Sequence, residues 1–261
     1  MALLELQKIS KSFGGLQAVK ELDLSIERGE IVGLIGPNGA GKTTVFNIIS
    51  GVFKPSGGKI LFKNNDITGL RPHCVVNKGL SRTFQLTTLF GNLTVLENIL
   101  LGFYLKSRIG YRKAIFDIGS NRVQARLLDD AVGLADFMGI GKKRNELAKN
   151  LSHGHCRVLE VAIALATGPE LLLLDEPVTG MSAIESAEMM DKIREINKKG
   201  ISILLVEHHM KVVMGVCEKI CVLDFGIKIG EGSPNEICNN QRVIKAYLGE
   251  KYAIRSPGHK S

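Results

Sequence analysis

The eight residues Gly36–Thr43 have the types and spacing needed to bind phosphate groups. They follow the pattern G-x-x-x-x-G-K-T. Glycines let consecutive backbone N–H groups turn toward a phosphate without a Cβ in the way. The Lys42 ammonium can reach β- and γ-phosphates, and the Thr43 hydroxyl can bind Mg²⁺. The pattern predicts a phosphate-binding P-loop.

The segments on either side of this loop supply the context that the motif needs. Residues 30–35 are strand-like, and residues 44–50 form a helix-compatible run that stops at Gly51. The N-terminus of such a helix adds partial positive charge at the phosphate position. The alternative, a glycine turn before a chance Lys-Thr pair, fits these flanks poorly. We expect nine residues to hold the phosphates: Gly36, Pro37, Asn38, Gly39, Ala40, Gly41, Lys42, Thr43 and Thr44.

The acidic pair Asp175 and Glu176 is the second chemical signal. It ends an apolar run, residues 171–174, that is typical of a buried strand. Because the carboxyl ends of parallel strands meet at one edge of a sheet, we expect the pair to lie beside the P-loop. Asp175 would hold Mg²⁺, and Glu176 would polarise the attacking water as general base. Taken alone, the pair could equally be a turn after a buried strand; the P-loop favours catalysis.

Ser152 and Gly154 stand before a helical run, residues 156–166, and could form a second anion site. Serine is a good N-cap, glycine permits close backbone approach, and helix N-termini attract anions. On spacing alone, however, a plain helix cap is the better interpretation. Two histidines and a cysteine within residues 153–156 are metal-binding types, but no fourth ligand is evident.

Hydrophobic periodicity indicates how these segments are positioned. Residues 3–9 and 21–27 alternate as strands do, with a turn at residues 12–15, and residues 59–62 suggest a further strand. The first third therefore predicts an antiparallel β layer against an α/β core. A β-α-β pattern over residues 171–206, followed by a hairpin over 219–231 and a helical piece from Ser233, predicts the rest of the core.

Residues 86–150 predict helices instead. Thr94 and Glu97 form a capping box for a helix reaching Leu105, and Ser120 is expected to cap a second helix through Met138. The apolar stripe expected for that second helix is Val123, Leu127, Leu128, Ala131 and Leu134.

Together these segments predict an α/β fold: a P-loop NTPase (RecA-like) core with an antiparallel β subdomain and an inserted helical subdomain. We expect one domain over residues 1–249. Residues 1–85 and 167–249 would form the core and β subdomain, and residues 86–166 the helical subdomain. Residues 250–261 are polar and basic, and we expect a disordered tail.

The composition is that of an ordinary globular protein, with 261 residues, 44% hydrophobic and 23% charged. The net charge of +8 could suit nucleic acid or anionic lipid, but the basic residues are spread out. Five scattered cysteines suit a reducing compartment. We expect no signal peptide, and no apolar run approaches the ~20 residues of a membrane-spanning helix.

In this order, the P-loop, a Leu-Ser-x-Gly element and Asp-Glu-Pro resemble the ATP-binding cassette (ABC) family over about residues 3–249. The resemblance implies an ATPase that uses ATP and Mg²⁺ and dimerises head to tail. ATP would lie between one subunit's P-loop and the signature element of the other, residues 151–155. Ser152 and Gly154 match the family's phosphate-contacting positions.

The resemblance also implies roles for single residues. Phe13 matches the aromatic residue that stacks on adenine. Gln85 matches the glutamine that senses Mg²⁺ and water and couples to the membrane partner. His208 matches the switch histidine at the γ-phosphate, and residues 180–183 match the D-loop. The expected catalytic residues are thus Glu176, His208, Lys42 and Gln85, and the expected Mg²⁺ ligands are Thr43, Gln85 and Asp175.

Within the family the chain most resembles the ATPase subunits of branched-chain amino acid importers. The matching segments are residues 13–16, 36–44, 82–85, 89–90, 93–98, 206–208, 226–232 and 246–249. Such ATPases sit on the cytoplasmic face of the plasma membrane. The implied partners are membrane permease subunits, a second cassette ATPase, either a paralogue or a second copy, and indirectly a solute-binding protein outside the membrane. Nucleic acid is not an expected partner.

Four positions depart from the family pattern: His155 stands where Gln or a similar residue is usual, Cys156 where Gln is common before Arg157, Ser182 where Asp or Asn is frequent, and His209 where Asp is common. Urea importer and lipopolysaccharide exporter ATPases share much of the pattern and remain alternatives. A cassette ATPase acting on nucleic acid or ribosomes is the alternative from another class, and a nucleotide switch without turnover is a third.

Overall fold

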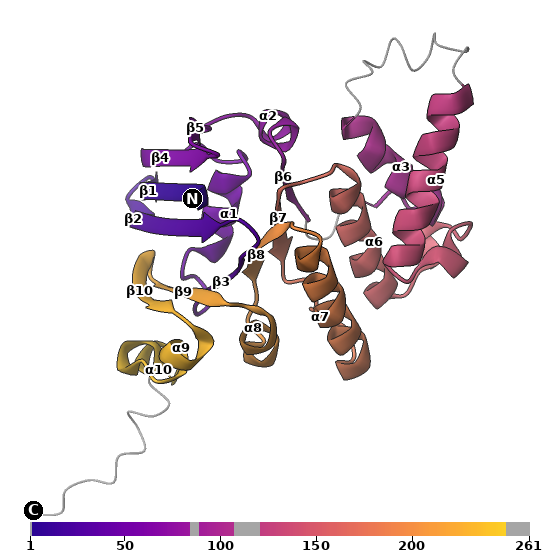
Figure 1. Ribbon diagram of the computed structural model, residues 1–261. Helices are drawn as coiled ribbons and strands as arrows, with labels where there is room; N and C mark the ends of the chain where they lie inside the picture. The colour runs from indigo at the N-terminus through magenta and orange to yellow at the C-terminus, as the bar shows by residue number, and fades with distance from the viewer. Residues whose placement is uncertain (1, 84–88, 107–120, 249–261) are drawn as a thin grey trace, which may run out of the picture. The chain divides into compact units, whose positions relative to one another are not determined.

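The computed structural model describes residues 2–83, 89–106 and 121–248 (Figure 1). These residues cluster into two compact units: unit 1 comprises residues 2–70 and 204–248, and unit 2 comprises residues 71–83, 89–106 and 121–203. Both units combine strands and helices, which confirms the predicted α/β class. The finer division into core, β and helical subdomains stays a prediction.

The strands follow the sequence expectation except for two short ones, residues 65–66 and 80–82, which were not predicted. The strands are β1 (Ala2–Phe13), β2 (Leu16–Glu27), β3 (Ile31–Ile35), β4 (Gly57–Phe62), β5 (Asn65–Asp66), β6 (Leu80–Arg82), β7 (Leu171–Asp175), β8 (Ser202–Val206), β9 (Lys219–Asp224) and β10 (Ile227–Gly232). Strands β1 and β2 are longer than predicted, and Phe13 ends β1 instead of lying in the turn.

The helices include two single turns of 3₁₀ helix. They are α1 (Lys42–Ile49), α2 (Pro72–Asn77), α3 (Val95–Lys106), α5 (Asn121–Phe137), η1 (Gly141–Lys143), η2 (Ala148–Asn150), α6 (His153–Ala166), α7 (Ala183–Lys198), α8 (Met210–Val216), α9 (Pro234–Cys238) and α10 (Gln241–Leu248). Within the described residues, no helix combines the length and hydrophobicity needed to cross a membrane.

Unit 1 contains a four-stranded antiparallel sheet in the order β2-β1-β4-β5 (Figure 1). Its register places Leu4 opposite Ile26 in β2 and opposite Phe62 in β4. Leu22, Leu24 and Ile26 are all buried, as their alternation predicts. This sheet is the predicted β layer.

Unit 1 also contains β3, which pairs in parallel with β9, and β9 pairs antiparallel with β10. All five residues of β3 are buried, so it is an interior strand that ends directly at Gly36. Apolar residues of α1, including Phe46, Ile48 and Ile49, are fully buried. The P-loop is therefore held at both ends by well-packed elements, β3 before it and α1 after it.

Unit 2 pairs β6 in parallel with β7, with Arg82 beside Leu173. All five residues of β7 are buried, and the strand ends at Asp175 as predicted. The predicted capping box at Thr94–Glu97 is present and begins α3, and a second capping box, Ser182–Glu185, begins α7. Helices α3, α5 and α6 pack together (Figure 1).

Two sequence predictions about the helical segments were wrong. Leu128 was expected on the buried stripe of α5, but it is exposed; Ala131 of the same stripe is buried as expected, and Ala135, which was not on the stripe, is buried too. The helix predicted from residue 156 begins three residues earlier, at His153, because Ser152 caps it directly. The expected cap at Ser120 lies outside the described residues.

Candidate functional site

Three glycines give the P-loop of unit 1 its shape. Gly36, Gly39 and Gly41 have φ angles of 155°, 80° and 102°, which side chains rarely allow. A Cβ on Gly36 would lie 2.2 Å from the carbonyl oxygen of Leu223, and one on Gly41 would lie 2.6 Å from that of Ala18. Glycine is therefore required at both positions by the packing of the loop.

The β9–β10 turn supports the loop from outside. The backbone N–H of Gly226 donates to the Ala40 carbonyl over 3.0 Å, and the Gly226 carbonyl accepts from the Lys20 N–H over 2.8 Å. The predicted hairpin thus connects the P-loop to β2. Sequence reasoning placed this hairpin in the fold but gave it no part in the site.

Lys42 and Thr43 begin α1 and carry the polar groups of the loop. The Lys42 ammonium is buried and donates to the carbonyls of Gly36 (2.7 Å) and Pro37 (3.0 Å). Thr43 is exposed. Within the part of the chain that the structure describes, no side chain caps α1 and no acidic residue lies in its first turn, so neither group competes there with an incoming anion.

Phe13 lies at the end of β1 with 42% of its surface exposed. Its ring meets the edge of Phe53 with centroids 5.3 Å apart, and the Lys11 ammonium lies 5.0 Å from its centroid. The ring is therefore held by neighbours and still open to solvent, which suits stacking on a planar base.

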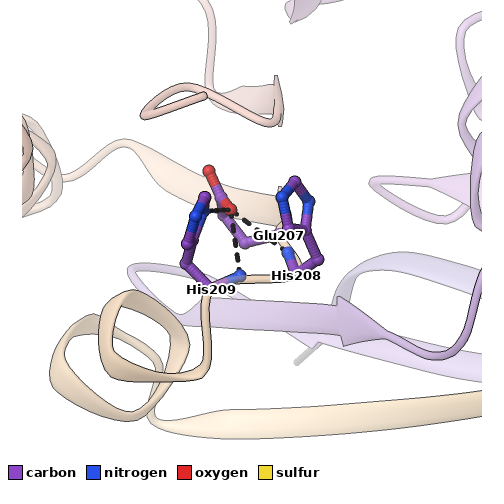
Figure 2. A group of neighbouring side chains, drawn as sticks. All are labelled: Glu207, His208 and His209. Atoms are coloured by element: carbon purple, nitrogen blue, oxygen red, sulfur yellow. Dashed lines mark hydrogen bonds and ion pairs between the residues drawn. The ribbon is translucent and has the colours of Figure 1, made fainter. Parts of the chain in front are cut away.

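His208 follows β8 within the segment Glu207–His208–His209. Figure 2 shows both imidazoles beside the Glu207 carboxylate. Glu207 is fully buried and accepts the backbone N–H groups of His208 (3.1 Å) and His209 (3.4 Å). The carboxylate thereby holds the backbone of the histidine pair, while His208 itself is exposed.

Asp175 in unit 2 ends β7 and is buried with Arg82 as its ion-pair partner. The Arg82 Nη2 atom lies 2.8 Å from Asp175 Oδ2, and only 7% and 2% of the two side chains are exposed. The Asp175 N–H donates to the Thr83 hydroxyl over 3.2 Å. Sequence reasoning gave Arg82 no role of its own; the signal was a cation at the end of a strand parallel to β7.

Glu176 has a φ of 48°, a left-handed conformation that costs a non-glycine residue free energy. The Thr179 hydroxyl donates to Glu176 Oε2 over 3.3 Å, and the Thr179 N–H donates to the Glu176 carbonyl over 3.2 Å. The side chain is half-buried. The turn thus directs Glu176 away from the course of β7 and holds it there.

The signature element of unit 2 contacts Thr179, the residue before the D-loop segment, in the same unit. Ser152 caps α6 by accepting the His155 N–H (3.3 Å), and its hydroxyl also lies 2.6 Å from His155 Nδ1. His153 Nε2 lies 3.0 Å from the Thr179 carbonyl. These three side chains have partners within the chain.

Gly154 is buried, and a Cβ there would lie 2.5 Å from Glu185 Oε1. Glu185 in turn accepts the Ser182 N–H at the start of α7, and hydrogen bonds from Ser182 lower the pKa of this carboxyl group. Packing against Glu185 therefore favours glycine at position 154, in addition to the phosphate contact expected from the sequence.

Helix α6 carries a buried ion pair one turn beyond the signature. Arg157 Nη1 lies 2.9 Å from Glu160 Oε2, with 6% and 9% of the side chains exposed. Burial raises the pKa of the Glu160 carboxyl group, and Arg157 opposes the shift. Burial also raises the pKa of the neighbouring Cys156 thiol.

The predicted site residues thus fall into two described groups. The P-loop, Phe13 and His208 belong to unit 1; Asp175, Glu176, Ser152 and Gly154 belong to unit 2. Gln85 lies outside the described residues.

Comparison with known proteins gives two family matches. The family model of the ABC transporter matches residues 19–179, and that of the branched-chain amino acid ATP-binding cassette transporter matches residues 228–253. The chain is 41% identical over 250 residues to the high-affinity branched-chain amino acid transport ATP-binding protein LivG of Escherichia coli (strain K12). That match covers 95% of this chain and 98% of the relative.

Two further relatives and one solved structure extend this result. A probable LivG of Archaeoglobus fulgidus is 36% identical, with 95% and 96% of the chains covered. The lipopolysaccharide export system ATP-binding protein LptB of Haemophilus influenzae is 31% identical, with 97% and 100% covered. The ADP conformation of an ATP-binding cassette of an ABC transporter superposes with a TM-score of 0.84 at 28% identity, over 96% of this chain and 100% of the other.

Proposed function

We propose, from the premise that this chain belongs to the ABC transporter family, that it is the ATP-hydrolysing subunit of a membrane importer for branched-chain amino acids. The match to the ABC transporter family supports the binding and hydrolysis of ATP. The observation that carries the substrate is the 41% identity to LivG over nearly the whole chain, together with the match of residues 228–253 to the branched-chain family. The lower identity to LptB makes lipopolysaccharide export the second candidate.

The P-loop binds the nucleotide phosphates in this proposal. Backbone N–H groups of residues 39–44 and the uncapped start of α1 attract the anion. The Lys42 ammonium, which now contacts two loop carbonyls, donates to the β- and γ-phosphates instead. Phe13, whose side chain is partly exposed, stacks on the adenine.

The donor chemistry of the proposed metal ligands fits Mg²⁺. Thr43 offers an exposed hydroxyl and Asp175 a carboxylate, both hard oxygen donors. Arg82 contacts Oδ2 of Asp175, and the same carboxylate would also help to hold the metal. Gln85 completes the set on sequence grounds. When bound, Mg²⁺ neutralises charge on the β- and γ-phosphates.

Glu176 is the general base in this scheme. Its carboxylate accepts a proton from the water that attacks the γ-phosphorus, while ADP leaves on the opposite side. The left-handed turn at Glu176 and its bond to Thr179 fix the carboxylate in advance. His208 donates to the γ-phosphate and stabilises the charge that develops there.

We further propose that two cassettes pair head to tail, with ATP between the P-loop of one and residues 151–155 of the other. The partner is a second copy or a paralogue, and the pair binds permease subunits at the cytoplasmic face of the membrane. Closure on ATP would move the permeases through the region of Gln85. A solute-binding protein would deliver the amino acid from outside.

Uptake by the host cell tests this function. Cells whose own copy is replaced by Lys42→Ala should lose accumulation of radiolabelled leucine, because the phosphates lose their main cation. Lys192→Ala, which removes a surface ion pair with Glu195 and a contact with the Phe137 ring, should leave uptake unchanged. Normal leucine uptake in Lys42→Ala cells, together with defective lipopolysaccharide export, would favour the second candidate.

A further inference from the structure

Glu207, His208 and His209 bring three potential metal ligands together in unit 1. One ligand atom from each residue lies within 4.8 Å of the others. The two imidazole centroids are 4.4 Å apart with their planes at 35°, and His209 Nδ1 lies 3.3 Å from Glu207 Oε2. Figure 2 shows the two rings on either side of the carboxylate.

These distances are close to those of a metal site. Tetrahedral Zn²⁺ with bonds of about 2.0–2.1 Å requires ligand atoms about 3.3 Å from each other. The pair His209 Nδ1 and Glu207 Oε2 already has this separation. The third ligand is a ring nitrogen of His208. Because both histidines are exposed, their side chains can rotate to bring this nitrogen closer without disturbing the core.

The chemistry of the group selects the ion. Two imidazole nitrogens and one carboxylate oxygen suit Zn²⁺, Cu²⁺ or Ni²⁺ better than Mg²⁺, which prefers oxygen ligands. Two backbone N–H groups hold the buried Glu207 carboxylate in position beneath the rings. Three protein ligands leave a fourth position for water.

We propose that Glu207, His208 and His209 form a binding site for a divalent transition metal ion, separate from the Mg²⁺ of the nucleotide. A further consequence rests on the proposed function: bound metal withdraws the His208 imidazole from the γ-phosphate, so the occupied cassette hydrolyses ATP more slowly.

Zinc titration of the full-length, nucleotide-free chain tests the site, with calorimetry as the readout. Wild type should bind one more equivalent of Zn²⁺ than His209→Asn, or bind it at least ~10-fold more tightly. His73→Asn, which removes another exposed histidine from α2, should titrate like wild type. Equal titration of wild type and His209→Asn would overturn the proposal.

A second measurement needs no substitution. Zn²⁺ should protect His208 and His209 of the wild-type chain from modification by diethylpyrocarbonate, while His73 stays reactive. Unprotected His208 and His209 at a Zn²⁺ concentration that saturates the titration would equally overturn the site.

ATP hydrolysis at buffered free Zn²⁺ separates the two claims. Wild type should be inhibited at the Zn²⁺ concentration that fills the site, and His209→Asn should resist inhibition. If Zn²⁺ binds as described but hydrolysis is unaffected, the site stands and the role assigned to His208 is refuted. If Zn²⁺ inhibits the wild type but not His209→Asn, both the metal site and the withdrawal of His208 from the γ-phosphate are supported.

Discussion

At the scale of single residues, Glu176 carries the clearest chemical expectation. Its carboxylate is the proposed general base, so Glu176→Gln should lower ATP turnover by about 10²–10⁴-fold while ATP still binds. Phosphate release measures turnover, and a fluorescent ATP analogue measures binding. Glu188→Gln, an exposed change on α7, is the control and should be silent. Near-normal turnover of Glu176→Gln would remove it from this role.

The buried pair Arg82–Asp175 carries a stability prediction. Arg82→Ala leaves the Asp175 carboxylate buried without its cation and should destabilise the protein by ~3–5 kcal/mol. Arg194→Ala breaks a pair of similar length, 2.6 Å, that is 40% and 71% exposed, and should cost at most ~1 kcal/mol. Urea unfolding compares the two. Equal costs would mean that burial does not decide the strength of the pair.

A double variant sharpens this comparison. Adding Asp175→Asn to Arg82→Ala removes the unpaired buried charge and should recover much of the lost stability. No recovery would assign the effect of Arg82 to its packing.

The residue scale also shows where sequence reasoning succeeds. The P-loop was predicted because each of its residue types has a local reason: glycines for the left-handed turns and Lys-Thr at the helix start. Arg82 received no separate role because its partner lies 93 residues away in sequence. Only the parallel pairing of β6 with β7 brings the two side chains together.

At the scale of elements, the junction of α6 and α7 depends on Gly154. A Cβ there would displace the Glu185 carboxylate, which caps α7 through a 2.9 Å bond from the Ser182 N–H. Gly154→Ala should therefore not give the increase in stability that replacing glycine by alanine normally brings inside a helix. Gly133→Ala in α5, where a Cβ meets nothing within 4 Å, should stabilise by ~0.5–1 kcal/mol. Equal stabilisation of both variants would contradict the packing role.

Thiol reactivity tests the core around β9. Burial raises the pKa of Cys217 and of Cys221 to about 12. Both groups therefore stay protonated thiols at pH 8 and become reactive only as the pH approaches 12 or the chain unfolds. Cys238 is exposed and should react with iodoacetamide at pH 8. Mass spectrometry of labelled peptides reads this out; early labelling of Cys221 would contradict the burial.

Elements were predictable wherever local signals decide them. A capping box, a helix start at Ser233 and a buried apolar run placed α3, α9 and β7 to within a residue or two. One position on the buried face of α5 was predicted wrongly: Leu128 is apolar but exposed, while Ala131 is buried as expected. Burial of a helix face depends on tertiary contacts that periodicity alone does not contain.

At the scale of the whole molecule, the net charge of +8 raises the question of a nucleic-acid partner. Family membership and the identity to LivG point instead to a membrane transporter. The permeases and the second cassette lie outside this chain, so its sequence and structure constrain them only through the surfaces that they would share.

Capture of the assembled complex tests the central claim most directly. Tagged Glu176→Gln, which should bind ATP without hydrolysing it, is purified from membranes in ATP and Mg²⁺, and the captured proteins are identified by mass spectrometry. The account predicts capture of two membrane permeases. A second cassette ATPase should be captured with them if the pair is a heterodimer, and no other cassette ATPase if two copies of this chain pair. Ribosomal or nucleic-acid-binding proteins without any permease would contradict the assignment to transport.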